Sequence, residues 1–349
     1  MKKGDNTART PMALYRTYRP LEFKDVRGQG EIVSVLEAAV KRGKVAHSYL
    51  FAGGRGTGKT SMARILAHAL STSEQDIYEM DAASNRGIDE IRELREGVAT
   101  LPFNSTYKFY IIDEAHALTH DAWGALLKTL EEPPPHAIFV LATTELDRVP
   151  DTITSRCQVF NFKKPSHETL KTLALDISKK EGATLEPAGA ELIALIGDGS
   201  FRDTLGILQK VLTVSTDSRL TEEEVGKVVG APRGEVVNHF LSALAAKDVA
   251  EAVGQFHTAL RGGAEPKVFV LLVITKVRAM LLLRFAPKLK GELAEQFGQD
   301  DLEFLQGLAT TGAALNASVL AELLTALIEM NRAPLPQLPL ELALYRALG

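Results

Sequence analysis

The sequence predicts an α/β domain followed by two helical domains. Short apolar segments alternate with helical patterns up to about residue 164, a glycine-rich loop follows the first of these segments, and no strand pattern continues after Pro165. Strands that alternate with helices are typical of a mostly parallel sheet covered on both faces. We therefore expect a flexible N-terminus at 1–12, the α/β domain at 13–165, a small helical domain at 166–216 and a second helical domain at 217–349.

Five apolar segments are the expected strands, and helical patterns lie between them. The expected strands are Ser48–Ala52, Ile77–Met80, Phe109–Ile112, Ile138–Thr143 and Val159–Phe162. The expected helices are Ile32–Arg42, Lys59–Leu70, Asp89–Gly97 and Asp121–Glu131, and then Glu168–Glu181, Pro187–Ile196 and Arg202–Leu212. Thr221–Glu224 predicts a capping box that opens a further helix. Val268–Leu283 is apolar but contains Lys276 and Arg278, so we expect a buried helix there and no membrane span.

Composition and charge limit the class of protein. The 349 residues contain 40 Lys and Arg against 44 Asp and Glu, a formal net charge of -4, and 45% hydrophobic residues. This slight acidity excludes a uniformly basic nucleic-acid coat. The single cysteine, Cys157, excludes an internal disulfide and a zinc site built from cysteines. The first residues lack the apolar region of a secretory signal, so we expect a cytoplasmic protein that makes no membrane contact.

A phosphate-binding loop is predicted at Gly53–Thr60, which fits the pattern G-x-x-x-x-G-K-[ST] between an expected strand and an expected helix. Glycines let backbone N–H groups surround phosphate oxygens, and the N-terminus of the following helix attracts the same anions. Lys59 is expected to contact the β- and γ-phosphates of ATP, and Thr60 to coordinate Mg²⁺. The nucleotide-binding residues expected in this loop are Gly53, Gly54, Arg55, Gly56, Thr57, Gly58, Lys59, Thr60 and Ser61.

Two further strand ends supply polar side chains. Asp113 and Glu114 follow the apolar strand Phe109–Ile112, and Thr143 and Thr144 end the next strand. Ligands of open parallel sheets bind at the carboxyl ends of the strands. We expect Asp113 to hold Mg²⁺ and Glu114 to polarise the attacking water. A threonine at the end of the next strand can contact the γ-phosphate or that water.

Several segments spread over Tyr15–Leu212 match one family together. They are Tyr18–Pro20, Phe23–Gln29, the phosphate-binding loop, Asp81–Gly87, Asp113–His116, Ala125–Pro134, Ser155–Cys157 and Gly199–Asp203. In these segments the chain resembles the AAA+ clamp-loader ATPases. Among those ATPases it is most similar to the gamma/tau family of bacterial DNA polymerase III. The last third fits that family only in its helical character and length.

The resemblance implies an AAA+ domain with a five-stranded parallel sheet, a helical lid at 166–216 and a helical collar at 217–349. It implies that Arg19, Pro20 and Val26 line the adenine pocket. Thr144 and Arg202 would be the two sensor residues, both counted as catalytic together with Glu114 and Lys59. Arg156 would be an arginine finger that acts in trans, on ATP bound to a neighbouring subunit.

The resemblance also implies a set of cofactors and partners. ATP and Mg²⁺ are the expected cofactors. The expected partners are further copies of the chain, delta-like and delta-prime-like subunits, the sliding clamp and primed DNA. One departure from the family bears on metal content: relatives usually carry a cysteine-rich zinc insert, but Leu70–Ile77 crosses that gap without a cysteine. We therefore expect no structural zinc.

DNA contact is expected at Asn85, Arg86 and Arg92, on the segment that in the family faces DNA. Ser84–Gly87 precedes an expected helix, and Ser84 and Asn85 are common N-cap residues. A helix N-terminus also accepts phosphate. The alternative is an ordinary capped helix with solvated arginines. Contacts to phosphates position a duplex without reading its bases, so binding would be independent of sequence.

The predicted function is that of an ATP-driven motor subunit, which hydrolyses ATP to open a sliding clamp and load it onto primed DNA within the polymerase III holoenzyme. One alternative is another AAA+ ATPase that remodels nucleic acid, such as a branch-migration motor. The match over Ala125–Pro134 argues against it. A second alternative is a structural loader subunit of the delta-prime type. Against this alternative, the sequence keeps the residues expected to carry hydrolysis: Lys59, Thr60, Asp113 and Glu114.

Overall fold

The computed structural model describes residues 12–215 and 218–348, and the chain forms two compact units. The first unit comprises the chain up to residue 173 together with residues 197–206. The second unit comprises residues 174–196 and the chain from residue 207 onward. The expected flexible segment 1–12 lies, apart from Met12, outside the described residues. The division into three domains at 165 and 216 stays a prediction.

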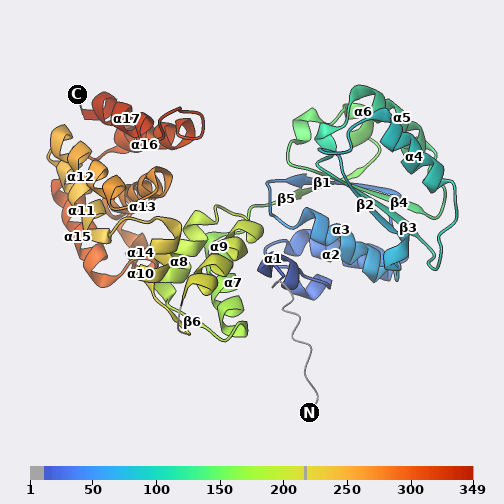
Figure 1. Ribbon diagram of the computed structural model, residues 1–349, viewed down its shortest axis with the longest axis horizontal. Coiled ribbons are helices and arrows are strands. Elements are labelled where there is room, and N and C mark those ends of the chain that lie inside the picture. Colours follow the sequence, from blue (N-terminus) through green and yellow to red (C-terminus); the bar gives the residue numbers. More distant parts are fainter. Residues whose placement is uncertain (1–11, 216–217, 349) are drawn as a thin grey trace, which may run out of the picture. The chain divides into compact units, whose positions relative to one another are not determined.

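A five-stranded parallel sheet forms the centre of the first unit, as predicted (Figure 1). Its strands are β1 (Ser48–Gly53), β2 (Ile77–Asp81), β3 (Lys108–Asp113), β4 (Ala137–Thr143) and β5 (Gln158–Phe162). The strand order is β2-β3-β4-β1-β5. Nearly all residues of β1, β3 and β4 are buried, which explains why these central strands read as continuous apolar runs in the sequence.

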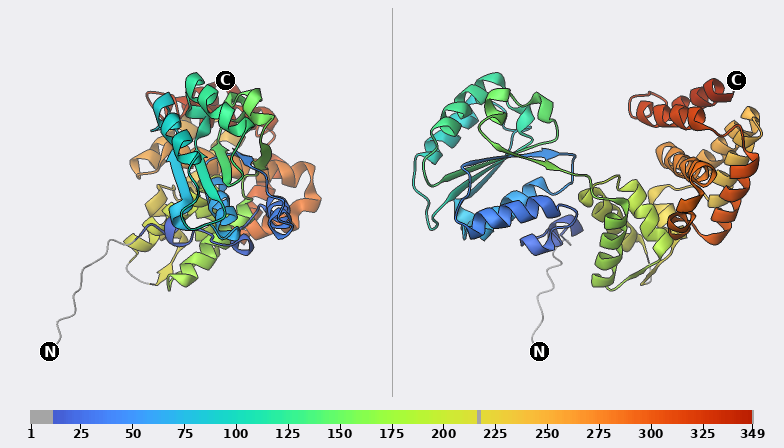
Figure 2. Two further views of the ribbon diagram at one scale, coloured as in Figure 1. Left: turned by 90° about the vertical axis from the view of Figure 1, so that its right-hand side faces the viewer. Right: turned by 180° about the vertical axis from the view of Figure 1, so that it is seen from behind.

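Helices cover both faces of this sheet (Figure 2). Successive side chains of a strand point to opposite faces, so Phe109 and Ile111 of β3 pack with α2 (Gly30–Lys41) and α3 (Lys59–Ala69). The residues between them, such as Tyr110, pack on the other face with α4 (Ile88–Val98) and α5 (His120–Glu131). The first unit also contains two short helices, α1 (Leu14–Thr17) and α6 (Asp151–Thr154).

The second unit is almost entirely helical. Two helices, α7 (His167–Lys180) and α9 (Phe201–Val214), have residues in both units. The other helices are α8 (Pro187–Ile196), α10 (Glu222–Val229), α11 (Gly234–Ala245), α12 (Val249–Arg261), α13 (Pro266–Phe285), α14 (Lys290–Gln296), α15 (Gln299–Thr311), α16 (Ala317–Glu329) and α17 (Leu338–Leu348). Single 3-10 turns lie at Phe23–Asp25, Glu74–Asp76, Ala115–Ala117, Leu146–Arg148 and Pro287–Leu289.

The expectation that strands end before Pro165 is wrong. A small parallel sheet pairs β6 (Thr184–Leu185) with β7 (Arg219–Leu220). Two residues per strand are too few to produce an alternating apolar pattern, so nothing in the sequence distinguishes them from loop.

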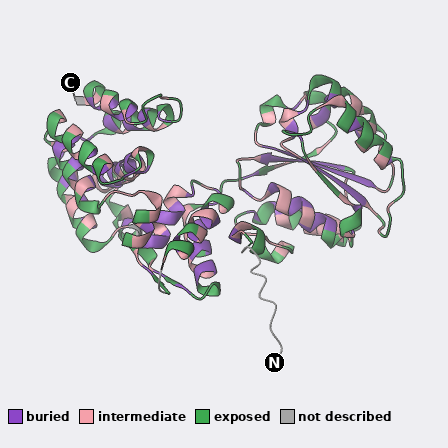
Figure 3. Ribbon diagram, viewed as in Figure 1, coloured by how far each residue is buried: buried purple, intermediate pink, exposed green. Residues whose placement is uncertain are grey.

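The long helix α13 packs into the core of the helical unit, as predicted for its apolar sequence. Phe269 of α13 contacts Phe240 and Phe256 with ring centroids 5.0 Å apart in both pairs. Figure 3 shows buried residues along much of this helix. The predicted capping box is confirmed, because Thr221 and Glu224 bond each other's backbone N–H groups. Of the helices that the structure describes, none combines the length and the apolar character that a membrane span requires.

Candidate active site

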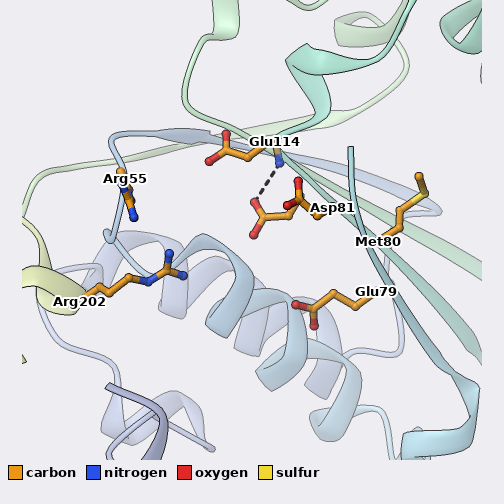
Figure 4. Close-up of a pocket in the computed structure, with 7 residues that line it drawn as sticks. Arg55, Glu79, Met80, Asp81, Glu114 and Arg202 are labelled. Carbon is orange, nitrogen blue, oxygen red and sulfur yellow. Dashed lines mark hydrogen bonds between the residues drawn. The ribbon is translucent and has the colours of Figure 1, made fainter. Parts of the chain in front are cut away.

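A cavity of about 390 Å³ lies at the carboxyl ends of β2 and β3 in the first unit. Figure 4 shows two arginines on one side of it and acidic side chains on the other. Its lining residues are Arg55, Glu79, Met80, Asp81, Asp113, Glu114 and Arg202. The volume is at the lower end of the range for small-molecule pockets. Four of these residues were expected at the nucleotide: Arg55, Asp113, Glu114 and Arg202.

Glycines shape the loop that connects β1 to α3. Gly56 has a φ of +70°, and a Cβ there would collide with the Ser200 hydroxyl. The backbone N–H of Phe201 donates to the Gly56 carbonyl at 3.0 Å, and Thr57 Oγ1 donates to the Gly54 carbonyl at 2.9 Å. The start of α9 therefore packs directly on this loop, and that contact brings the Arg202 side chain to the cavity.

Lys59 is a buried cation without a carboxylate in direct contact. Lys59 is only 6% exposed, and its Nζ donates to the carbonyls of Gly53 at 2.7 Å and Gly54 at 2.8 Å. Burial lowers the pKa of Lys59, and the nearby charges of Glu114 and Asp113 only partly oppose that shift. An anion at this position would compensate the buried charge.

Thr60 and Asp113 meet directly. Thr60 Oγ1 donates to Asp113 Oδ2 at 2.7 Å, and the other carboxylate oxygen of Asp113 accepts from the Glu114 backbone N–H at 3.0 Å. Hydroxyl and carboxylate oxygens are the ligands that Mg²⁺ prefers in proteins. The pair lies beside a buried cation and a glycine-rich loop, so the residues fit a Mg²⁺–nucleotide site.

Glu114 adopts a left-handed backbone conformation, with φ +48° and ψ +42°. A residue other than glycine in this region carries strain, and such strain is common at functional sites. Its carboxylate Oε2 accepts a hydrogen bond from Thr144 Oγ1 at 3.1 Å. His116 lies beside it, with Nδ1 3.1 Å from Thr143 Oγ1 and Nε2 3.1 Å from a carboxylate oxygen of Glu145. The structure thus brings together Glu114, which we expect to polarise the attacking water, and Thr144, the predicted sensor threonine.

Of the residues expected around adenine, Arg19 contacts the start of α3. Arg19 Nε donates to Ser61 Oγ at 3.0 Å, and burial lowers the pKa of Arg19. Val26 packs against the apolar core that α2 and α3 form with the sheet, and Pro20 is half-buried. Arg202 lies with its guanidinium carbon 5.7 Å from the centre of the Tyr15 ring.

Arg156 does not line the cavity. Its Nη2 donates to Glu131 Oε1 at 2.7 Å and its Nη1 donates to the Thr152 carbonyl at 2.7 Å. Its side chain is 36% exposed. Within one chain, therefore, the structure does not bring Arg156 to the phosphate-binding loop. This placement agrees with a role in trans, which stays a prediction.

The residues expected at DNA are exposed, but the expected N-cap is wrong. Gly87 is the N-cap residue of α4, and its lack of a side chain leaves the cap without a side-chain hydrogen bond. Asn85 reaches back instead and donates from Nδ2 to the Asp81 carbonyl at 3.2 Å. Arg92 pairs with Asp89 at 3.0 Å. DNA contact by Asn85, Arg86 and Arg92 stays a prediction.

The sequence did not point to Glu79, Met80 and Asp81 as cavity residues. Asp81 stands opposite Asp113 in the β2–β3 register. A signal existed, because Asp81 directly follows one predicted strand as Asp113 directly follows another. Without the strand order, that parallel could not show that β2 and β3 are neighbours.

Asp76 fixes the conformation of the segment between α3 and β2 through its hydrogen bonds. Its carboxylate is buried and accepts from the backbone N–H groups of Phe103 at 2.6 Å and Asn104 at 3.0 Å, and from Ser73 Oγ at 3.0 Å. Burial alone would raise the pKa of Asp76, but these hydrogen bonds, with one from Ser105, lower it to about 2. Across residues 12–215 and 218–348, no three His, Cys, Asp or Glu side chains gather as a metal site would require. The expected lack of zinc stays a prediction.

Comparison with known proteins finds relatives among the subunits of DNA polymerase III. The family model "DNA polymerase III, delta subunit" matches residues 28–86 and 74–166. DNA polymerase III subunit tau of Bacillus subtilis is 40% identical over 302 residues, which are 80% of this chain and 54% of that protein. DNA polymerase III subunit gamma/tau of Mycobacterium tuberculosis is 34% identical, covering 97% of this chain and 62% of that protein. DNA polymerase III subunit gamma of Buchnera aphidicola is 35% identical, covering 69% of this chain and 70% of that protein.

Solved structures show the fold. The RuvB Holliday junction branch migration motor of Thermotoga maritima superposes with a TM-score of 0.53 at 24% identity, covering 65% of this chain and 79% of that one. At this identity the likeness concerns architecture alone. The chain spans 54% and 62% of the lengths of the Bacillus and Mycobacterium relatives.

Proposed function

Because the chain belongs to the family of DNA polymerase III gamma/tau subunits, we propose that it is an ATP-driven motor subunit of a clamp loader. It hydrolyses ATP to open a sliding clamp and load it onto primed DNA in the cytoplasm. The observation that carries the proposal is the buried, uncompensated Lys59 beside the Thr60–Asp113 pair and Glu114. A subunit that had lost hydrolysis would have no need to keep all four side chains at one edge of the sheet.

Each side chain of the site has a distinct task in this proposal. The loop from Gly53 to Ser61 surrounds the phosphates with N–H groups, and Lys59 places its charge against the β- and γ-phosphates. Thr60 and Asp113 hold Mg²⁺, which neutralises charge on the phosphates when it is bound. Glu114 accepts a hydrogen bond from the attacking water and orients it. Thr144 fixes the Glu114 carboxylate, to which it already donates.

The remaining proposed contacts lie around this centre. Arg19, Pro20 and Val26 surround adenine. Arg202, at the start of α9, contacts the phosphates from the helical lid (166–216). Arg156 serves a neighbouring copy in an assembly with delta-like and delta-prime-like subunits, held by a collar at 217–349. Asn85, Arg86 and Arg92 contact the phosphates of DNA.

Stimulation of ATP hydrolysis tests the proposal. The rate would be measured for the assembled loader alone, with the clamp, with primed DNA, and with both, and Lys59→Ala in place of the chain serves as the control. We expect a low basal rate that rises most when clamp and primed DNA are both present. A rate that DNA raises fully without the clamp would indicate a different nucleic-acid motor. A rate that the Lys59→Ala control does not lower would assign hydrolysis to another subunit.

A further inference from the structure

Arg156 is held at three points that come from three different elements. Its backbone carbonyl accepts from Ser48 Oγ of β1 at 2.6 Å. Its Nη1 donates to the Thr152 carbonyl of α6, and its Nη2 donates to Glu131 Oε1, each at 2.7 Å. The first contact fixes the backbone and the other two fix the guanidinium plane. Glu131 is the only one of these three partners that contacts the guanidinium through a charged group.

The negative charge of Glu131 is unfavourable at its position in α5. It is the last residue of α5, and Glu132 follows as the C-cap. Negative charge at a helix C-terminus is unfavourable, by roughly 0.3–1 kcal/mol for an exposed group. The ion pair with Arg156 is also half-exposed, with side chains 42% and 36% accessible, and exposed pairs contribute little to stability. Neither helix formation nor folding stability therefore accounts for a carboxylate at this position.

We infer that Glu131 is a positioning residue, which fixes the orientation of the Arg156 guanidinium toward the ATP of a neighbouring copy. The inference rests on the proposed role of Arg156 in trans. A guanidinium has five N–H groups in a planar fork. The bonds to Thr152 and Glu131, with a longer one of 3.3 Å to Ser155 Oγ, leave N–H groups of this fork for phosphate oxygens. A fixed plane lets those remaining groups meet the phosphate without first losing side-chain freedom.

The test uses the assembled loader with clamp and primed DNA, and compares Glu131→Gln with Glu132→Gln. Both variants remove one carboxylate charge at the end of α5, but only the first removes the charge of the group that accepts from Arg156. Three quantities are measured: the stimulated kcat, the KM for ATP, and the affinity for ADP with aluminium fluoride, which imitates the transferring phosphoryl group. The melting temperature of each variant shows whether it folds.

For Glu131→Gln we expect kcat to fall about tenfold or more, with the KM unchanged, because small misplacements of a catalytic group are costly. The affinity for ADP with aluminium fluoride should fall in parallel, while the affinity for ADP alone stays the same. Glu131→Asp, which keeps the charge, should restore part of the loss. Glu132→Gln should stay within about twofold of the unmodified chain, and the melting temperature should not change for either variant.

The double variant Glu131→Gln with Arg156→Ala separates the possible outcomes. If Glu131 acts through Arg156, the double variant should be no slower than Arg156→Ala alone. A Glu131→Gln rate equal to or above that of Glu132→Gln overturns the inference, as does an additional loss in the double variant. If Arg156→Ala alone keeps the full stimulated rate, the proposed finger is wrong. If Arg156→Ala is slow while Glu131→Gln is not, only the positioning role is wrong.

Discussion

Two lysines, one in each unit, are equally buried but have different partners. Lys59 and Lys276 are both 6% exposed. Lys276 Nζ donates to Asp301 Oδ1 at 2.7 Å and to Asn238 Oδ1 at 2.8 Å, and Asn238 Nδ2 donates to the same Asp301 oxygen at 3.1 Å. Lys59 donates only to two carbonyls of its own loop, and burial lowers its pKa.

The difference separates a structural cation from a binding cation. The charge of Lys276 is neutralised by Asp301 within its own helical bundle, so this network is complete. The charge of Lys59 is not neutralised by any group it contacts, and a buried charge without a partner is costly. Because Lys59 lies at the glycine-rich loop, beside the Thr60–Asp113 pair, a bound ligand can supply the missing anion. Burial alone would not have distinguished the two residues.

The largest expected effect is on nucleotide binding. Lys59→Met should weaken ATP binding by about 100-fold or more, because it removes charge-assisted hydrogen bonds of about 1.5–3 kcal/mol each. Lys276→Met should leave the affinity unchanged, because its network lies in the helical unit. Titration with a fluorescent ATP analogue measures both. Equal affinities for the two variants would remove the distinction between the lysines.

The next effect separates binding from turnover. Glu114→Gln should keep ATP affinity and lower the stimulated rate about 100-fold, since the Thr60–Asp113 pair survives. Asp113→Asn should weaken Mg²⁺-dependent binding as well. Binding and hydrolysis are measured on the same preparations. Normal hydrolysis by Glu114→Gln would show that another group activates the water.

The two lysine variants should affect folding stability in the reverse order of their effect on ATP binding. Lys276→Met leaves Asp301 and Asn238 without their buried partner, and the free energy of unfolding should fall by about 2 kcal/mol. Lys59→Met removes an uncompensated buried charge, so the free energy of unfolding should stay the same or rise. Denaturant titration of both variants without nucleotide checks the sign. A clear loss of stability in Lys59→Met would show that its carbonyl contacts fully compensate the charge.

Asp76 extends the comparison to a buried anion that hydrogen bonds stabilise. Its pKa is lowered from 3.8 to about 2, so the folded state favours the charged form. This stabilisation is complete above about pH 4 and is lost as the pH falls toward 2. Asp76→Asn should therefore lower the free energy of unfolding by about 1–2 kcal/mol at pH 6, and the difference should shrink below pH 4. Denaturant titrations between pH 6 and pH 3 measure it. A difference that does not depend on pH would argue against a charged Asp76.

Much of the fold and the site could be predicted because local sequence determines it. Buried parallel strands are apolar runs, and the loop at Gly53–Thr60 needs its glycines, its lysine and its threonine in one short segment. Asp113 and Glu114 were found because a strand delivers them to a known edge. Asp81 was missed because its position depends on strand order, which local sequence does not encode.

Other features depend on contacts between distant segments. The bond between Glu131 and Arg156 joins residues 25 positions apart, and the packing of Ser200 on Gly56 joins two separate stretches of the chain. The β6–β7 pair forms only because the folded helices bring two dipeptides together. Neither the hydrophobic periodicity nor any motif of the sequence predicts such contacts.

A mixing experiment tests most directly whether a neighbouring copy completes the ATP site, as we propose. Lys59→Ala removes the binding lysine but keeps Arg156, and Arg156→Ala does the reverse. Each variant alone should lose most clamp- and DNA-stimulated hydrolysis, since arginine fingers contribute roughly 10³–10⁵ in rate. Mixed assemblies should regain activity where the ATP of an Arg156→Ala copy faces the Arg156 of a Lys59→Ala copy. Mixed assemblies that form but regain nothing, or full stimulated hydrolysis by Arg156→Ala alone, would contradict the claim.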